Sequence, residues 1–181
     1  MGCGKSSVGK ILATLLPECR LIDLDTYIEE KQGKNIPEIF NEYGKAAFRR
    51  MEREALEEIF SDKSRPRAIL SLGGGTVTSE QCRQLIRQHT DCFYLRATTD
   101  TLLDNLEGNS DGRPMLNPTQ PVEAQSTETS SEREALRHRI ESLMQTRSPQ
   151  YIATANHIID IDGLSFAQIA EAVEDNILNI K

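Results

Sequence analysis

The sequence predicts a three-layer α/β fold with a parallel sheet. Short apolar segments typical of strands alternate along the chain with segments of helical periodicity, which is the pattern of βαβ units. A glycine-rich loop precedes the first helical segment, and a second one, Gly73–Gly75, follows an apolar strand. The length of 181 residues suits one domain, so we expect a single domain over 1–181.

The first half of the chain gives six expected elements. A helix over Lys5–Leu16 ends at Pro17, which cannot continue it. Glycine, lysine and asparagine at 33–35 then separate two short helices, and apolar residues recur at helical spacing in the helix that follows Gly44. The expected elements after the first helix are a strand at Arg20–Asp23 and helices at Thr26–Gln32, Ile36–Tyr43 and Lys45–Phe60, followed by a strand at Ala68–Leu72.

The second half continues the alternation but contains one exceptional segment. Residues 107–131 are rich in Gly, Pro, Asn, Ser and Thr and almost free of aliphatic side chains, which is typical of a functional lid or a disordered segment. We expect a mobile lid there. The other expected elements are helices at Ser79–Gln88, Thr99–Leu106, Glu132–Arg147 and Phe166–Ile177, and strands at Asp91–Arg96 and His157–Ile161.

Charge and composition exclude several classes of protein. The formal net charge is −7, which argues against a partner that is a nucleic acid. The longest apolar runs are about six residues, far short of the roughly 20 that a membrane span needs, so we expect no membrane association. Four cysteines lie far apart without metal-ligand spacing, which favours a cytoplasmic protein without zinc.

The loop before the first helix has the chemistry of a phosphate site. Gly2-Cys3-Gly4-Lys5-Ser6, with Ser7 after it, matches the second half of the pattern GxxxxGK[ST]. Glycine backbone amides surround a phosphate, the lysine neutralises it and the serine hydroxyl holds Mg²⁺, so we expect ATP and Mg²⁺ as cofactors. The alternative is a frayed, glycine-rich end with a chance match. The first glycine of the pattern and its strand would precede Met1, and we expect them to be missing from the recorded sequence.

Two aspartates follow the first predicted strand. Asp23 and Asp25 would lie on one face if the strand continued through Asp25, pointing into the crevice where open α/β sheets bind ligands. One carboxylate could hold Mg²⁺ and the other could orient a hydroxyl as a base. The alternative is that Asp25 caps the next helix.

Candidate anion-binding groups occur at three further places. Glu52 falls on the apolar face of its helix and could fix Arg49 for a substrate carboxylate, although an exposed ion pair is the favoured alternative. Three glycines at Gly73, Gly74 and Gly75 allow close approach of a backbone to a ligand. Arg113 lies in the candidate lid and could close over a transferring phosphate, or remain a solvated loop residue. Arg147 continues an apolar helical stripe and should turn inward toward an anion, unless it only caps the helix.

Together these segments resemble the shikimate kinase family of small P-loop kinases. The matching segments are MGCGKSSVGK, LIDLD, IFNEYGKAAFRRMERE, LSLGGGTV, GRPML and RSPQYIATA, in this order along essentially the whole chain. The resemblance implies a sheet of order 2-3-1-4-5, whose first central strand is absent from this sequence. It also implies ATP-dependent phosphorylation of the 3-hydroxyl of shikimate, a shikimate-binding region at about 25–60, the lid at 107–131, and a monomer.

The resemblance also implies a role for each candidate residue. Lys5 would neutralise the ATP phosphates, while Ser6 and Asp23 would bind Mg²⁺. Asp25 would hold the shikimate hydroxyls as the general base. Arg49, oriented by Glu52, and Arg147 would hold the shikimate carboxylate with the Gly74 amide. Arg113 would contact the phosphates.

The chain departs from the family at two visible positions. Lys45 follows Gly44 where the family commonly has glutamate, and Leu106 stands near the place of an arginine that often stacks on adenine. Two alternatives stay open. One is another small-metabolite or nucleoside-monophosphate kinase of the same fold, and the other is a relative that binds ligands without catalysis.

Overall fold

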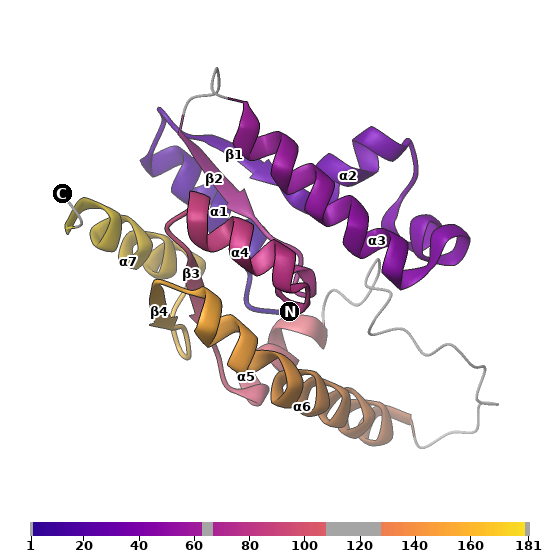
Figure 1. The fold of residues 1–181 in the computed structure, drawn as a ribbon. Helices are drawn as coiled ribbons and strands as arrows, with labels where there is room; N and C mark the ends of the chain where they lie inside the picture. The colour runs from indigo at the N-terminus through magenta and orange to yellow at the C-terminus, as the bar shows by residue number, and fades with distance from the viewer. Residues whose placement is uncertain (1, 63–66, 108–127, 180–181) are drawn as a thin grey trace.

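A computed structural model describes residues 2–62, 67–107 and 128–179 (Figure 1). Strands and helices alternate along the chain, which confirms the predicted α/β class. The elements in order are α1 (Lys5–Leu15), β1 (Arg20–Asp23), α2 (Leu24–Gln32), α3 (Ile36–Ser61), β2 (Ala68–Ser71), the 3₁₀ turn η1 (Thr76–Thr78), α4 (Glu80–His89), β3 (Phe93–Arg96), α5 (Thr99–Glu107), α6 (Glu128–Thr154), β4 (His157–Asp160) and α7 (Phe166–Asn179).

The strands pair in parallel, as predicted. β1 pairs with β2 from Arg20 opposite Ala68 onward, and β3 pairs with β4 from Phe93 opposite His157 onward. In the part of the chain that the structure describes, these are two separate pairs rather than one continuous sheet.

Helices cover both faces of the strands (Figure 1). One apolar core joins α1, α5, α6 and α7 to β3 and β4, and the other joins α2, α3 and α4 to β1 and β2. On β2, Ile69 packs against the first core and its neighbour Leu70 against the second. Alternate side chains are therefore buried on opposite faces, as expected for parallel strands covered on both sides.

Capping residues set the boundaries of α2 and α3. The side chain of Asp23 accepts hydrogen bonds from the first turn of α2, so this helix begins at Leu24, two residues earlier than predicted. Asn35 and Glu38 form a capping box at the start of α3. The predicted break at Gly44 is confirmed, because its φ of 76° interrupts the helical geometry inside α3.

Helix α6 is longer at both ends than predicted. It begins at Glu128 instead of Glu132 and continues past Arg147, through Pro149, to Thr154. Glu107 belongs to α5 and residues 128–131 belong to α6, so the irregular segment is shorter than predicted at both ends, and the lid itself stays a prediction. The remainder of that segment, including Arg113, lies outside the described residues. Within the described ranges, no helix combines the length and the apolar character that a membrane crossing requires.

Candidate active site

The phosphate loop, Gly2–Gly4, lies directly before α1 at the start of the described residues. Gly2 and Gly4 have φ values of 70° and 72°, a region that other residues rarely adopt, and Gly4 is the N-cap of α1. A Cβ at Gly4 would collide with the ring of Phe166. The first turn of α1 contains no acidic side chain and Ser7 is exposed there, so the helix N-terminus is electrostatically suited to an anion.

Lys5 lies beside the thiol of Cys3 in this loop. Lys5 Nζ is 3.6 Å from Cys3 Sγ. Burial acts to raise the pKa of the Cys3 thiol, but Lys5 and the other charges and hydrogen bonds nearby outweigh it and lower that pKa to about 7. The negative charge of the ionised Cys3 thiol in turn raises the pKa of Lys5, although burial acts to lower it. Lys5 is therefore a cation at neutral pH, as neutralisation of a phosphate requires.

Ser6 and Asp23 form the oxygen pair expected for a magnesium site. Ser6 Oγ donates a hydrogen bond to Asp23 Oδ2 at 2.9 Å. The other carboxylate oxygen, Oδ1, accepts from the backbone N–H of Asp25 and caps α2. The cap fixes the orientation of the carboxylate, and oxygen donors of this kind suit Mg²⁺, which keeps several waters and takes few protein ligands.

Asp25 reaches the second glycine loop from the first turn of α2. β1 ends at Asp23 as predicted, so the strand does not continue through Asp25, which was the condition for both carboxylates to share one face. The alternative that Asp25 caps the helix is wrong, because Asp23 is the N-cap. A Cβ at Gly73 would lie 2.8 Å from Asp25 Oδ1 and 3.3 Å from Glu52 Oε1. Burial, followed by the negative charges of Asp23 and Glu52, raises the pKa of Asp25 to about 6. Asp25 is thus a half-buried base that is largely ionised at neutral pH.

Glu52 is fully buried and forms an ion pair with Arg49 one turn away on α3. Thr76 Oγ1 donates a second hydrogen bond to Glu52, at 2.6 Å. Burial raises the pKa of Glu52, whereas Arg49 and Thr76 oppose the rise. The exposed ion pair favoured from sequence is therefore wrong, and the alternative of a carboxylate that orients Arg49 describes the geometry.

The glycine loop brings three elements together. Gly75 passes directly under the guanidinium of Arg49, with 2.8 Å from its would-be Cβ to Arg49 Cζ. The carbonyl of Gly74 accepts hydrogen bonds from Arg147 Nη1 at 3.3 Å and from the Tyr151 hydroxyl at 2.5 Å. Arg147 is buried, as predicted from its place in the apolar stripe. Asp25, Arg49 and Arg147, from α2, α3 and α6, thus converge on the single loop Gly73–Gly75.

Two residues of this cluster were not among the predicted ones. Thr76 holds Glu52, and its only sequence signal is its place directly after the three glycines. Tyr151 lies four residues after Arg147, so helical spacing could have placed both on one face. The prediction that the helix ended at Arg147 concealed that relation.

A pocket of about 250 Å³ lies beside the phosphate loop, between α5 and the start of α7. Asn105 connects the pocket to the loop, because its Nδ2 donates to the carbonyl of Gly2 at 2.8 Å. Leu106, by contrast, is fully buried in the first core and does not line the pocket. The lining residues are Thr101, Asp104, Asn105, Ile161, Gly163, Leu164, Phe166 and Ile169.

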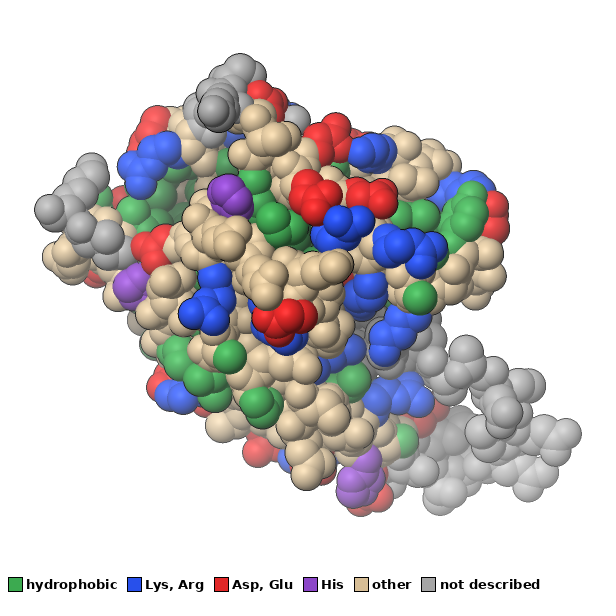
Figure 2. Space-filling view, viewed as in Figure 1, with side chains coloured by type: hydrophobic (Ala, Val, Ile, Leu, Met, Phe, Trp, Pro, Cys, Tyr) green, Lys and Arg blue, Asp and Glu red, His purple; other side chains and the backbone are tan. Residues whose placement is uncertain are grey.

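Basic side chains gather on one face of this acidic protein. Figure 2 shows lysine and arginine side chains over α3 and between α3 and α6 on the face in view. A local excess of positive charge raises the concentration of anionic ligands near a site. The α/β fold, the lysine-bearing phosphate loop and the cluster of arginines and carboxylates at the second glycine loop together indicate the class of P-loop phosphotransferases.

Comparison with known proteins identifies the family within that class. The family model for shikimate kinase matches residues 1–178. A shikimate kinase of Chlorobaculum tepidum is 36% identical over 180 residues, covering 97% of this chain and 87% of the relative. A shikimate kinase of Thermus thermophilus is 32% identical over 177 residues, covering 98% of this chain and 85% of the relative. The chain belongs to the shikimate kinase family and has shikimate kinase activity.

Solved structures agree with this assignment. A shikimate kinase from Acinetobacter baumannii in complex with shikimate is similar with a TM-score of 0.83 and 29% identity, over 100% of this chain and 90% of that one. A shikimate kinase from Bacteroides thetaiotaomicron is similar with a TM-score of 0.81 and 26% identity, over 98% and 93%. The α/β arrangement described above is therefore that of known shikimate kinases.

Proposed function

We propose that this chain transfers the terminal phosphoryl group of ATP to the 3-hydroxyl of shikimate, giving shikimate 3-phosphate, with Mg²⁺ as cofactor. The observation that carries the proposal is the convergence of Asp25, Arg49 and Arg147 on Gly73–Gly75. A buried arginine, a half-buried arginine and a half-buried carboxylate around one loop match an acceptor that has a carboxylate at one end and hydroxyls at the other.

The carboxylate of shikimate is held by the two arginines. Arg49 is held by its ion pair with Glu52, so its guanidinium is oriented before the acid arrives. Arg147 is buried beside the same loop and contacts the Gly74 carbonyl. Planar guanidinium groups recognise carboxylates through paired hydrogen bonds. The backbone of Gly73, Gly74 and Gly75 completes this end of the site, because the absence of Cβ atoms lets the acid approach the main chain.

Asp25 receives the proton of the attacking hydroxyl. With its pKa at about 6, Asp25 is mostly ionised at neutral pH but more basic than an ordinary aspartate. A general base works best with a pKa near the working pH. Lys5 acts to lower the pKa of Asp25, so this carboxylate lies within the electrostatic field of the phosphate loop. The hydroxyl would therefore lie between Asp25 and the incoming phosphoryl group.

ATP binds along the phosphate loop. The amides of Gly2, Cys3 and Gly4, with those of Ser6 and Ser7 at the start of α1, surround its phosphates, and Lys5 neutralises them. Mg²⁺ is held by Ser6 and Asp23, and when bound it neutralises charge on the transferring phosphates. The base of ATP occupies the pocket beside Asn105, where the ring of Phe166 offers an apolar face. Arg113 contacts the phosphates in this proposal.

We also propose that the two strand pairs belong to one sheet of order 2-3-1-4-5 and that the chain acts as a monomer. That order counts the absent strand as strand 1, so β1 and β2 take the places of strands 2 and 3, and β3 and β4 those of strands 4 and 5. Both pairs are parallel, as the order requires. Helices α1 and α7, which contact each other, cover one face of both pairs.

The test is a coupled ATP assay with shikimate and a panel of other hydroxy acids, sugar acids and nucleoside monophosphates. Arg49→Ala and Arg147→Ala each remove a charged contact to the acid, and we expect the KM for shikimate to rise about thirtyfold. Arg87→Ala, an exposed position on α4, is the matched control and should leave KM unchanged. Lack of shikimate phosphorylation, or an unchanged KM in Arg49→Ala, would refute the proposal. Preference for a nucleoside monophosphate would identify the other kinase class.

A further inference from the structure

The Gly74 carbonyl has two donors that differ in strength. The Tyr151 hydroxyl donates at 2.5 Å, which is short for an O–H···O hydrogen bond, whereas Arg147 Nη1 donates at 3.3 Å, which is long for an N–H···O bond. The hydroxyl is therefore the main partner of this carbonyl. Arg147 is only weakly held by it.

Arg147 keeps most of its hydrogen-bonding capacity unused. A guanidinium carries five N–H donors. Among the described residues, the bond to Gly74 is the one hydrogen bond that Arg147 makes, although its side chain is buried. The nearby carboxylate of Glu52 already pairs with Arg49 and accepts from Thr76. The remaining donors of Arg147 are not among the buried polar atoms that lack a partner in the described part of the chain, so they are open to solvent and can reach an external anion.

Tyr151 stands in a fixed place relative to Arg147. The two residues lie one turn apart on α6, and Tyr151 follows Pro149, where the helix lacks one backbone donor. The ring of Tyr151 packs against Tyr94 of β3, with 5.1 Å between ring centroids. The phenol is thus held by β3 on one side and by the glycine loop on the other, so it fixes the Gly74 peptide against α6.

We propose that Tyr151 is a positioning residue for recognition of the acceptor's carboxylate. Its hydroxyl satisfies the Gly74 carbonyl, which leaves the guanidinium of Arg147 free to bind the acid and holds the loop backbone in place beside it. Without the hydroxyl, Arg147 would turn onto the vacated carbonyl and withdraw donors from the acid. The inference rests on the proposed role of Arg147 as a ligand of the shikimate carboxylate.

The test is Tyr151→Phe, which keeps the ring and removes only the hydroxyl. We expect the KM for shikimate to rise about fivefold, the effect of one ordinary hydrogen bond, with kcat and the KM for ATP unchanged. Shikimate methyl ester, which lacks the carboxylate charge, should show a much smaller difference between the wild-type protein and the variant. A purely structural role would instead lower the melting temperature and the active fraction while leaving KM unchanged, and that result would overturn the proposal.

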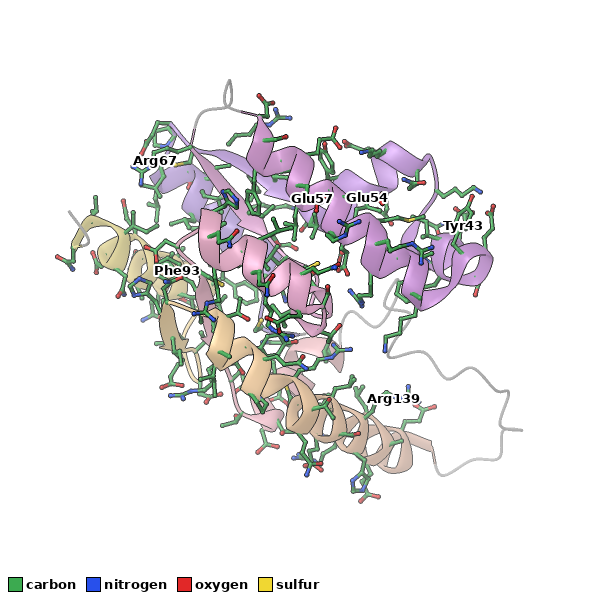
Figure 3. The ribbon with its side chains drawn as sticks, in the orientation of Figure 1. Tyr43, Glu54, Glu57, Arg67, Phe93 and Arg139 are labelled. Carbon is green, nitrogen blue, oxygen red and sulfur yellow. The ribbon has the colours of Figure 1, made fainter. Side chains whose placement is uncertain are left out.

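Arg67→Ala is the control outside the shikimate-binding region. Arg67 is exposed and directly precedes β2, so removing its side chain should leave every kinetic constant unchanged (Figure 3). Arg147→Ala distinguishes a failure of the proposed role of Tyr151 from a failure of the proposed function. If Arg147→Ala raises the KM for shikimate and Tyr151→Phe does not, the role of Tyr151 is wrong and the proposed function stands. If neither raises it, the proposed function fails as well.

If Tyr151→Phe does not fold, a second measurement tests the same hydroxyl. A fluorinated tyrosine at position 151 keeps the ring but ionises near neutral pH, after which it cannot donate a hydrogen bond. The KM for shikimate should then rise as pH increases through the pKa of the fluorinated phenol, and the wild-type protein should not show this rise. Identical pH profiles of KM for the two proteins would overturn the proposal.

Discussion

Asp25→Asn should stabilise the free protein at neutral and alkaline pH, although it removes the proposed base. The pKa of Asp25 is raised from 3.8 to about 6, first by burial and then by the charges of Asp23 and Glu52. The ionised carboxylate is therefore less stable in the folded protein than in the unfolded chain. Asparagine has nearly the same shape and no charge, so it removes this cost.

The magnitude follows from the two pKa values. Between pH 3.8 and about 6 the native protein binds more protons than the unfolded chain, so the contribution of Asp25 to the unfolding free energy falls as pH rises. Below pH 3.8 both states are protonated and nothing is lost. Taking a native pKa of about 6, the loss is about 1.5 kcal/mol at pH 5 and about 3 kcal/mol at pH 8, since one pKa unit corresponds to about 1.4 kcal/mol. A chain of this size would gain about 6–12 °C in melting temperature at pH 8.

The assay is denaturant unfolding of the wild-type protein and Asp25→Asn in buffers from pH 5 to pH 8. The dependence of the unfolding free energy on denaturant concentration must be the same in both proteins, so that a shifted midpoint reports stability. The stabilisation of the variant should increase by about 1.5 kcal/mol across this range. In parallel, kcat/KM of the wild-type enzyme should fall as pH decreases below about 6, because Asp25 becomes protonated. A variant that is less stable than the wild-type protein at pH 8, or a difference that is flat with pH, would refute the reasoning.

Three further substitutions test other parts of the structure. Glu52→Gln breaks the buried ion pair with Arg49 and should cost about 3 kcal/mol, measured as a lower melting temperature; an unchanged value would contradict the burial of this pair. Gly75→Ala places a Cβ against Arg49 at a φ of −104°, which alanine adopts freely, so displacement of Arg49 rather than backbone strain should give a higher KM for shikimate in steady-state kinetics; an unchanged KM would contradict the close approach of Gly75 to Arg49. Asn35→Ala removes the capping box of α3 and should lower the denaturation midpoint by the equivalent of about 1 kcal/mol, with kcat unaltered.

The parts of the fold that sequence predicts well are those with local causes. β1 is found at the predicted residues, because a short apolar run ends at a capping aspartate. The break at Gly44 is likewise local, since only glycine readily adopts its φ of 76°. The end of α6 is a counterexample. Proline usually marks a helix boundary, yet contacts of Arg147 and Tyr151 with Gly74, 73 and 77 residues away in sequence, hold the helix together across Pro149.

The state of Glu52 could not be settled from sequence for a similar reason. Spacing alone allows an ion pair with Arg49 on either an exposed or a buried face. The buried one becomes possible because Thr76, 24 residues away, supplies a further donor at 2.6 Å. A carboxylate inside a protein needs such partners, and they belong to another element. Sequence therefore identified Arg49 and Glu52 as a pair but favoured the wrong environment.

Backbone conformation does not explain why the second loop contains three glycines. None of them has a positive φ, so the loop itself could be formed by other residues. What they provide is space: Gly73 admits the carboxylates of Asp25 and Glu52, and Gly75 admits the guanidinium of Arg49. Side chains from separate helices can meet there because the loop contributes only main chain. A Cβ at Gly73 or Gly75 would push one of these charged groups away, so the glycines matter for bringing the charges together rather than for making the turn.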